Sequence, residues 1–121
     1  MNKIELIGRT TTDIEVKTSG ETKYATFQIA VRRNFKNSKG EYDTDFLPCI
    51  VSGGAAEVLG KYVKKGDQIG LIGSLRSKTT EENGVKKTLY SIAIDDFFFL
   101  EKKEVPNKAP EDELPFEVPG V

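Results

Sequence analysis

Apolar and polar residues alternate along most of the first hundred residues, and a period of two is typical of β-strands. The first alternation runs through Ile4 and Leu6, and it resumes at Ile14 and Val16 beyond the polar segment 8–12. We therefore expect one long strand with a bend or bulge at this segment, rather than two separate strands.

The segments 24–32 and 45–52 predict two further strands, each with apolar residues at every second position. Pro48 lies in the second segment and cannot donate a backbone hydrogen bond, so we expect an edge strand or an irregularity there. Its neighbour Cys49 lies in an apolar run, which favours a small buried side chain over a reactive thiol.

The segment 53–66 is the one clear helix prediction, because its apolar residues recur at helical spacing. Gly66 is suited to end this helix in the left-handed conformation, and Lys64 and Lys65 occupy the expected last turn. The predicted apolar stripe consists of Val58, Leu59, Tyr62 and Val63.

Two more strands are predicted over 68–77 and 86–95, and Asn83-Gly84 indicates a hairpin turn within a loop of several residues. Strand, strand, strand, helix, strand, strand is the order typical of the OB-fold, a five-stranded Greek-key barrel. We therefore predict an all-β OB-fold barrel with one helix between strands 3 and 4. A small sandwich is the alternative.

The segment 101–121 holds four prolines and many charges without an apolar period. It cannot bury enough apolar surface to offset its chain entropy. We predict a folded domain over 1–103 and a disordered acidic C-terminal tail over 104–121. The net charge also changes sign near this boundary. Residues 1–100 hold 15 basic and 13 acidic residues, a net charge of +2, whereas residues 101–121 hold 3 basic and 6 acidic residues, a net charge of −3.

The composition argues against several kinds of chemistry. The chain has no histidine, the commonest general base and metal ligand, and its single cysteine can form neither an intrachain disulfide nor a zinc site. No apolar run has the length of a membrane span. We expect a protein of the cytoplasm that is not an enzyme and binds no cofactor or metal.

The run 32–46 interleaves aromatic and basic residues. This pattern suits single-stranded nucleic acid, because bases stack on rings while cations neutralise phosphates. Arg76 and Lys78 in the next hairpin are placed to form the other wall of a groove. The alternative is a pair of solvated hairpins, with Phe35 and Phe46 packed into the core and the cations serving solubility.

Three segments of the chain together resemble a known protein family. The segments "NKIELIGRTTTDIEVK" and "TDFLPCIVSGGAAEVLGKYVKKGDQIGLIGSLRSK", with acids followed by "LPF" near the end, resemble the bacterial single-stranded DNA-binding protein family. The resemblance implies an OB-fold protomer, a homotetramer, and non-catalytic coating of single-stranded DNA in replication, recombination and repair. It places the protein in the bacterial nucleoid or in a phage-infected cell.

The resemblance also implies which residues contact nucleic acid. Phe35 and Phe46 keep two of the family's four stacking positions, whereas Ser52 occupies the third and Thr79 or Thr80 the fourth. We therefore expect weaker binding per protomer and a stronger salt dependence. The full predicted nucleic-acid site is Asn2, Lys3, Arg9, Arg32, Arg33, Phe35, Lys36, Phe46, Lys61, Arg76, Lys78 and Tyr90.

In the tail, the resemblance assigns docking of replication, recombination and repair proteins to an acidic and apolar motif. The family's tail ends at its phenylalanine, whereas five residues follow Phe116 here. An inert solubilising tail is the alternative to docking, and an OB-fold interaction or replisome assembly subunit with weak DNA affinity is the alternative function. The predicted docking residues are Asp112, Glu113, Leu114, Pro115 and Phe116.

Overall fold

The computed structural model describes residues 1–102, which form six strands and one helix. The predicted tail and its docking motif, including Asp112 and Phe116, lie outside the described residues, as does the predicted boundary at 103. The elements are β1 (Ile4–Thr10), β2 (Val16–Ser19), β3 (Thr22–Lys36), β4 (Tyr42–Ser52), α1 (Gly54–Tyr62), β5 (Gln68–Glu82) and β6 (Val85–Glu101).

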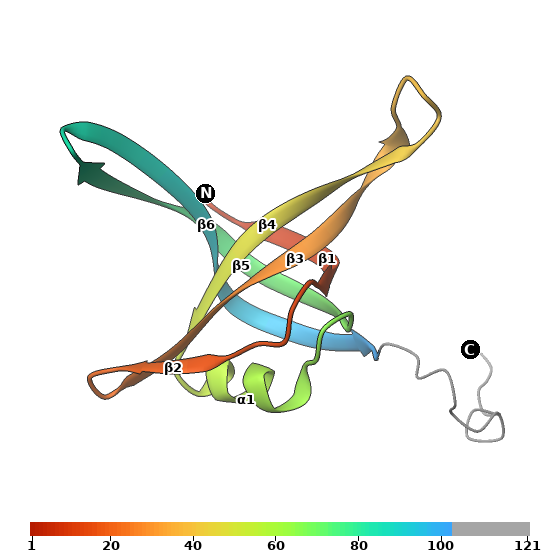
Figure 1. The fold of residues 1–121 in the computed structure, drawn as a ribbon. Coiled ribbons are helices and arrows are strands. Elements are labelled where there is room, and N and C mark those ends of the chain that lie inside the picture. Colours follow the sequence, from red (N-terminus) through yellow and green to blue (C-terminus); the bar gives the residue numbers. More distant parts are fainter. Residues whose placement is uncertain (103–121) are drawn as a thin grey trace, which may run out of the picture.

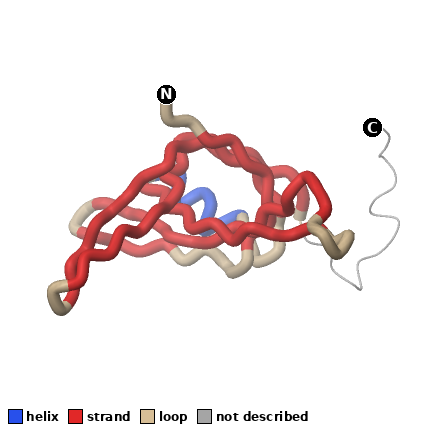
Figure 2. The backbone as a smooth tube through the Cα atoms, turned by 90° about the horizontal axis from the view of Figure 1, so that it is seen from above, coloured by secondary structure: helices blue, strands red, loops and turns tan. Residues whose placement is uncertain are grey.

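The strands form one sheet that closes on itself. Their order is β1-β5-β6-β4-β3-β2, and β1 also pairs with β3 through Arg9–Ala30 and Thr10–Ile29. Figure 1 shows α1 at the lower end of this barrel, and Figure 2 shows the strands as a ring with the helix beyond it. The predicted all-β OB-fold is confirmed, and the alternative sandwich is not formed.

The first predicted strand is two strands, so the expectation of a single bent strand was wrong. β1 pairs mainly with β5, whereas β2 pairs with β3, and residues 11–15 connect them. Thr10 ends β1 with its side chain buried at 3% exposure. Its hydroxyl donates to the Lys64 carbonyl at 2.8 Å and accepts from the Gly66 amide at 3.1 Å. These bonds tie the end of β1 to the turn that follows α1.

The helix is shorter than predicted and buries a different stripe. It ends at Tyr62, and Gly66, with φ +90°, lies in the following turn rather than closing the helix. Leu59 and Val63 are buried as expected. Val58 and Tyr62 are exposed instead, because spacings of three and four from Leu59 select Ala56 and Val63. The described part of the chain contains no helix long and apolar enough to cross a membrane.

The barrel interior is closed by α1 and filled by apolar side chains from β3, β4, β5 and β6, with the partly buried Ile4 and Leu6 of β1 packed against them. Cys49 is 2% exposed, and burial raises the pKa of its thiol to about 12, so the predicted structural role is confirmed. Pro48 lies opposite Gln28 of β3. On its other side, β4 pairs with β6 only at Cys49 and Ile50. The core comprises Ile14, Ala25, Phe27, Ile29, Cys49, Val51, Ala56, Leu59, Val63, Ile69, Leu71 and Ile92.

Two long hairpins project from the barrel on the side away from α1 (Figure 1). The β5–β6 pairing continues to Glu82 and Val85, so the turn is the two residues Asn83 and Gly84 rather than a longer loop. Both have positive φ, +54° and +79°, as a two-residue hairpin turn requires. The β3–β4 hairpin has a register shift between Arg32 and Lys36.

Candidate nucleic-acid interface

The outer face of the β3–β4 hairpin carries a ring beside a guanidinium group. Phe46 pairs with Ala30, and the next outward pair along the hairpin is Arg32 with Thr44. These pairs alternate with inward ones such as Ile29 with Leu47, so their side chains point away from the core. Phe46 is 58% exposed, which excludes the alternative in which this ring packs into the core.

The same outer face continues across β4, β6 and β5. Ile50 pairs with Ala93 in parallel register, and Ser91 and Leu89 follow at alternate positions of β6. Their partners on β5 are Arg76 and Lys78. We call this surface the outer strip, a run of exposed apolar groups flanked by cations, consisting of Arg32, Phe46, Ile50, Leu89, Arg76 and Lys78.

Phe35 lies on the opposite face of the hairpin from Phe46. Asp45 precedes Phe46 on β4 and therefore points to the other face, where it binds Arg33. Phe35 lines a hollow together with both of these residues and is 67% exposed. The structure thus exposes both predicted rings but does not place them on one surface.

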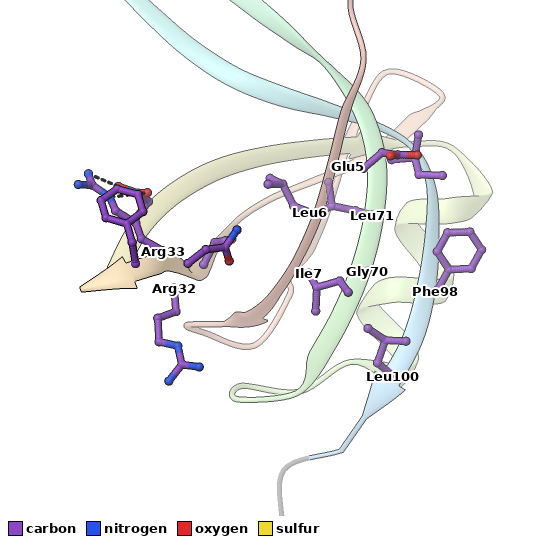
Figure 3. Close-up of a pocket in the computed structure, with 14 residues that line it drawn as sticks. Glu5, Leu6, Ile7, Arg32, Arg33, Gly70, Leu71, Phe98 and Leu100 are labelled. Carbon is purple, nitrogen blue, oxygen red and sulfur yellow. Dashed lines mark hydrogen bonds and ion pairs between the residues drawn. The ribbon is translucent and has the colours of Figure 1, made fainter. Parts of the chain in front are cut away.

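The hollow beside Phe35 has a volume of about 870 Å³ and a largely apolar wall (Figure 3). Ile7, Phe98 and Leu100 form this wall on the outer face of β1 and β6, and each is about half exposed. Arg33 lies across from them and extends in a different direction from Arg32. Phe98 and its neighbour Phe99 thus lie outside the core, at 48% and 52% exposure.

Three of the predicted cations are already paired with carboxylates. Lys3 lies 3.9 Å from Glu5, and Arg9 bonds to Glu101 and to the Gly66 carbonyl. Their positive charge is therefore partly neutralised within the protein. The third, Arg33, is held between two acids of β4.

Arg33 binds Asp45 through both its Nε and its Nη2. Its Nη2 lies 2.8 Å from Oδ1 of Asp45, and Asp43 lies 3.8 Å from its Nη1. The hydrogen bond with Asp45, followed by the attraction of its charge, raises the pKa of Arg33. The same hydrogen bond lowers the pKa of Asp45. Within residues 1–102, no carboxylate lies within 4.0 Å of the cations of Arg32, Lys36, Lys61, Arg76 or Lys78.

Three other predicted residues lie away from the outer strip. The Asn2 side chain exchanges two 2.9 Å hydrogen bonds with the Leu75 backbone and so extends the β1–β5 ladder. Lys61 lies on α1, at the end of the barrel opposite the hairpins (Figure 1). Tyr90 is 60% exposed but pairs with Ser77, which places it on the other face from Arg76.

Sequence reasoning omitted several members of this surface. Three residues that are exposed on the outer face are absent from the nucleic-acid site predicted from the sequence: Tyr42, Ile50 and Leu89. Counting alternate positions in both directions from Phe46 would have found Tyr42 and Ile50. Assigning Leu89 to this face requires the pairing register of β5 and β6, which the sequence alone does not show.

The sequence profile of the Single-strand binding protein family matches residues 1–100. The chain belongs to this family. It is 33% identical to "Single-stranded DNA-binding protein 1" of Streptococcus pyogenes serotype M18 (strain MGAS8232), with 96% of this chain and 99% of that protein covered. It is 37% identical to "Single-stranded DNA-binding protein 4" of Streptococcus agalactiae serotype V (strain ATCC BAA-611 / 2603 V/R), over 95% and 86% of the two chains.

A solved structure described as "Plasmodium falciparum SSB complex with ssDNA" has the same fold. Its TM-score is 0.74 at 28% sequence identity, and the match covers 84% of this chain and 96% of that one. The family resemblance read from the sequence is therefore confirmed, and the family membership extends over the whole described barrel.

Proposed function

We propose that this protein binds single-stranded DNA without sequence preference and protects it during replication, recombination and repair. The observation that carries the proposal is the exposed Phe46 beside Arg32, which has no carboxylate partner within residues 1–102, on the outer strip of a chain of this family. Relatives of similar length are named for binding single-stranded DNA, and a similar solved structure is described as a complex with it.

The chemistry of the outer strip explains the lack of sequence preference. Every base has a face that stacks on an aromatic ring, at about 1–3 kcal/mol per base. Among residues 1–102, Arg32, Arg76 and Lys78 have no carboxylate partner, so they can meet phosphates, which are the same in every sequence. Neither type of contact reads the edge of a base. The function requires no reaction, so the protein acts as a non-enzymatic DNA coat in the cytoplasm.

Assembly of several protomers is part of the proposal, with a homotetramer as the expected form. The apolar wall of Ile7, Phe98 and Leu100 supports it, because a contiguous exposed apolar face favours association. Sedimentation velocity of the protein alone and with a long oligonucleotide tests this point. A monomer at micromolar concentration in both samples would refute it.

Recruitment of replication, recombination and repair proteins by the tail is proposed from its sequence. The acidic residues Asp112 and Glu113 precede Leu114-Pro115-Phe116, a combination that fits an apolar pocket rimmed by basic residues. Deletion of residues 111–121 should abolish capture of such partners and slightly tighten DNA binding. Capture that survives the deletion would show that the tail has no docking role.

The DNA-binding proposal is tested by fluorescence anisotropy with labelled oligothymidine and with a duplex of equal length. We expect tight binding to the single strand, weak binding to the duplex, and affinity that falls as salt rises. Equal and weak binding to both would favour the alternative of an OB-fold interaction subunit with little DNA affinity.

A further inference from the structure

A tyrosine outside the predicted site lies on the same face as Phe46. Tyr42 is the first residue of β4, and Thr44 and Phe46 follow it at alternate positions. Side chains at alternate positions of a strand share a face, so Tyr42 extends the outer strip toward the hairpin tip. At about 3.4 Å per residue, the Cα atoms of Tyr42 and Phe46 lie about 14 Å apart, which leaves room for each ring to take its own base.

Two cations hold the ring of Tyr42. The Arg32 guanidinium carbon lies 4.6 Å from the ring centroid, and the Lys36 ammonium lies 5.9 Å from it. Both cations lack a carboxylate partner within residues 1–102, so they remain available to phosphates while they position the ring. Cation–π contacts of this kind fix an exposed aromatic side chain in one orientation.

The ring is accessible and borders a polar hollow. Tyr42 is 43% exposed, and the hollow of about 640 Å³ separates the hairpin from the end of β1. The hollow is lined by cationic and amide groups as well as the ring, and Arg9, Arg32, Asn34 and Gln68 are among them. These groups suit a nucleotide, whose base is flat and whose phosphate is negative.

We propose that Tyr42 is a further base-stacking residue and that Arg32 positions its ring while contacting the neighbouring phosphate. The inference rests on the proposed function, because it adds a second ring, beside that of Phe46, to the same DNA-binding surface. It also supplies a physical substitute for the stacking rings that are missing at Ser52 and at Thr79 or Thr80. The path of the strand then runs from Phe46 over Tyr42 toward the polar hollow.

The experiment compares the full-length Tyr42→Leu and Tyr42→Phe variants with the unmodified protein in oligothymidine titrations. Tyr42→Leu should weaken binding by about 5- to 150-fold, and Tyr42→Phe by less than about threefold, because phenylalanine keeps the stacking face. Neither variant should change the salt slope. Arg32→Gln should reduce that slope by about 0.7.

Tyr62→Leu is the matched control, since Tyr62 is also an exposed tyrosine beside a lysine, with Lys61 at 5.4 Å, but lies on the helix end. It should bind oligothymidine as the unmodified protein does. Irradiation of a complex with oligonucleotide carrying 5-iododeoxyuridine should attach DNA to Tyr42, a readout that a purely structural role would not give.

The outcomes separate the two proposals. If the unmodified protein does not bind oligothymidine, the proposed function itself fails. If it binds, the inference about Tyr42 is overturned by unchanged affinity in Tyr42→Leu, by absence of a cross-link at Tyr42, or by an equal loss in Tyr62→Leu. Loss confined to Tyr42→Leu together with the cross-link supports it.

Discussion

Arg33 and Asp45 face each other across β3 and β4 in a two-point ion pair, with Nη2 to Oδ1 at 2.8 Å and Nε to Oδ2 at 3.1 Å. This carboxylate occupies the positions that a DNA phosphate would take on the guanidinium group. The neighbouring Arg32 has no such partner within the described residues and stacks on Tyr42 instead. Adjacent arginines of one strand therefore differ in their availability to DNA.

Replacing the carboxylate should release Arg33. We expect Asp45→Asn to bind oligothymidine more tightly and to steepen the dependence of log affinity on log salt by about 0.7, the contribution of one more phosphate contact. Glu21→Gln is the control, because it removes the same charge from a turn without an ion pair among residues 1–102. Equal effects in both variants would show that net charge, rather than the freed guanidinium, is responsible.

The same pair predicts a pH dependence of stability. Hydrogen bonding to Arg33 lowers the pKa of Asp45, so the stabilisation is fully present above the unfolded carboxyl value of about 3.9 and is lost as pH falls through the lower folded value. The difference in thermal midpoint between the unmodified protein and Asp45→Asn should therefore shrink below about pH 4. A difference that grows on acidification would contradict this assignment.

A stacking ring can be added at Ser52. This residue is exposed and shares the outer face with Phe46 and Ile50 by alternation along β4. We expect Ser52→Trp to tighten oligothymidine binding, by up to about 1–3 kcal/mol for one more stacked base. Ser19→Trp, at the exposed end of β2, serves as the control and should leave the affinity unchanged. No gain at Ser52 would mean that DNA does not follow this part of the face.

The buried thiol of Cys49 should be inert in the folded protein. Its pKa of about 12 keeps it protonated at pH 8, and its side chain is 2% exposed, so a disulfide reagent should modify it only after unfolding. Because the folded pKa exceeds the unfolded value of about 8.5, this group costs stability as pH rises from about 8.5 to 12. The thermal midpoint of Cys49→Ala should therefore fall less over this pH range than that of the unmodified protein. Rapid labelling of the native protein by the disulfide reagent would refute the prediction that the thiol is inert.

The sequence predicted the barrel because alternation and turn residues are local signals. The strand through Phe27 and Ile29 and the turn at Asn83-Gly84 both follow from neighbouring residues alone. The break between β1 and β2 does not follow from neighbouring residues, because it depends on the hydrogen bonds between Thr10 and the turn after α1.

The candidate site was harder to predict for the same reason. Ring and cation types are visible in the sequence, and Phe46 and Arg32 were found from them. Which cations are free is not visible, because Arg9 is paired with a residue 92 positions away. The faces of Phe35 and Tyr90 likewise depend on strand register, which a single sequence does not fix.

The most direct test of the outer strip is the affinity of Phe46→Leu for oligothymidine, measured at several salt concentrations beside the unmodified protein. We expect a loss of about 1–3 kcal/mol with the same salt slope, because the substitution removes a stacking ring and leaves every cation in place. A variant that retains its fold and binds the single strand as tightly as the unmodified protein would contradict it.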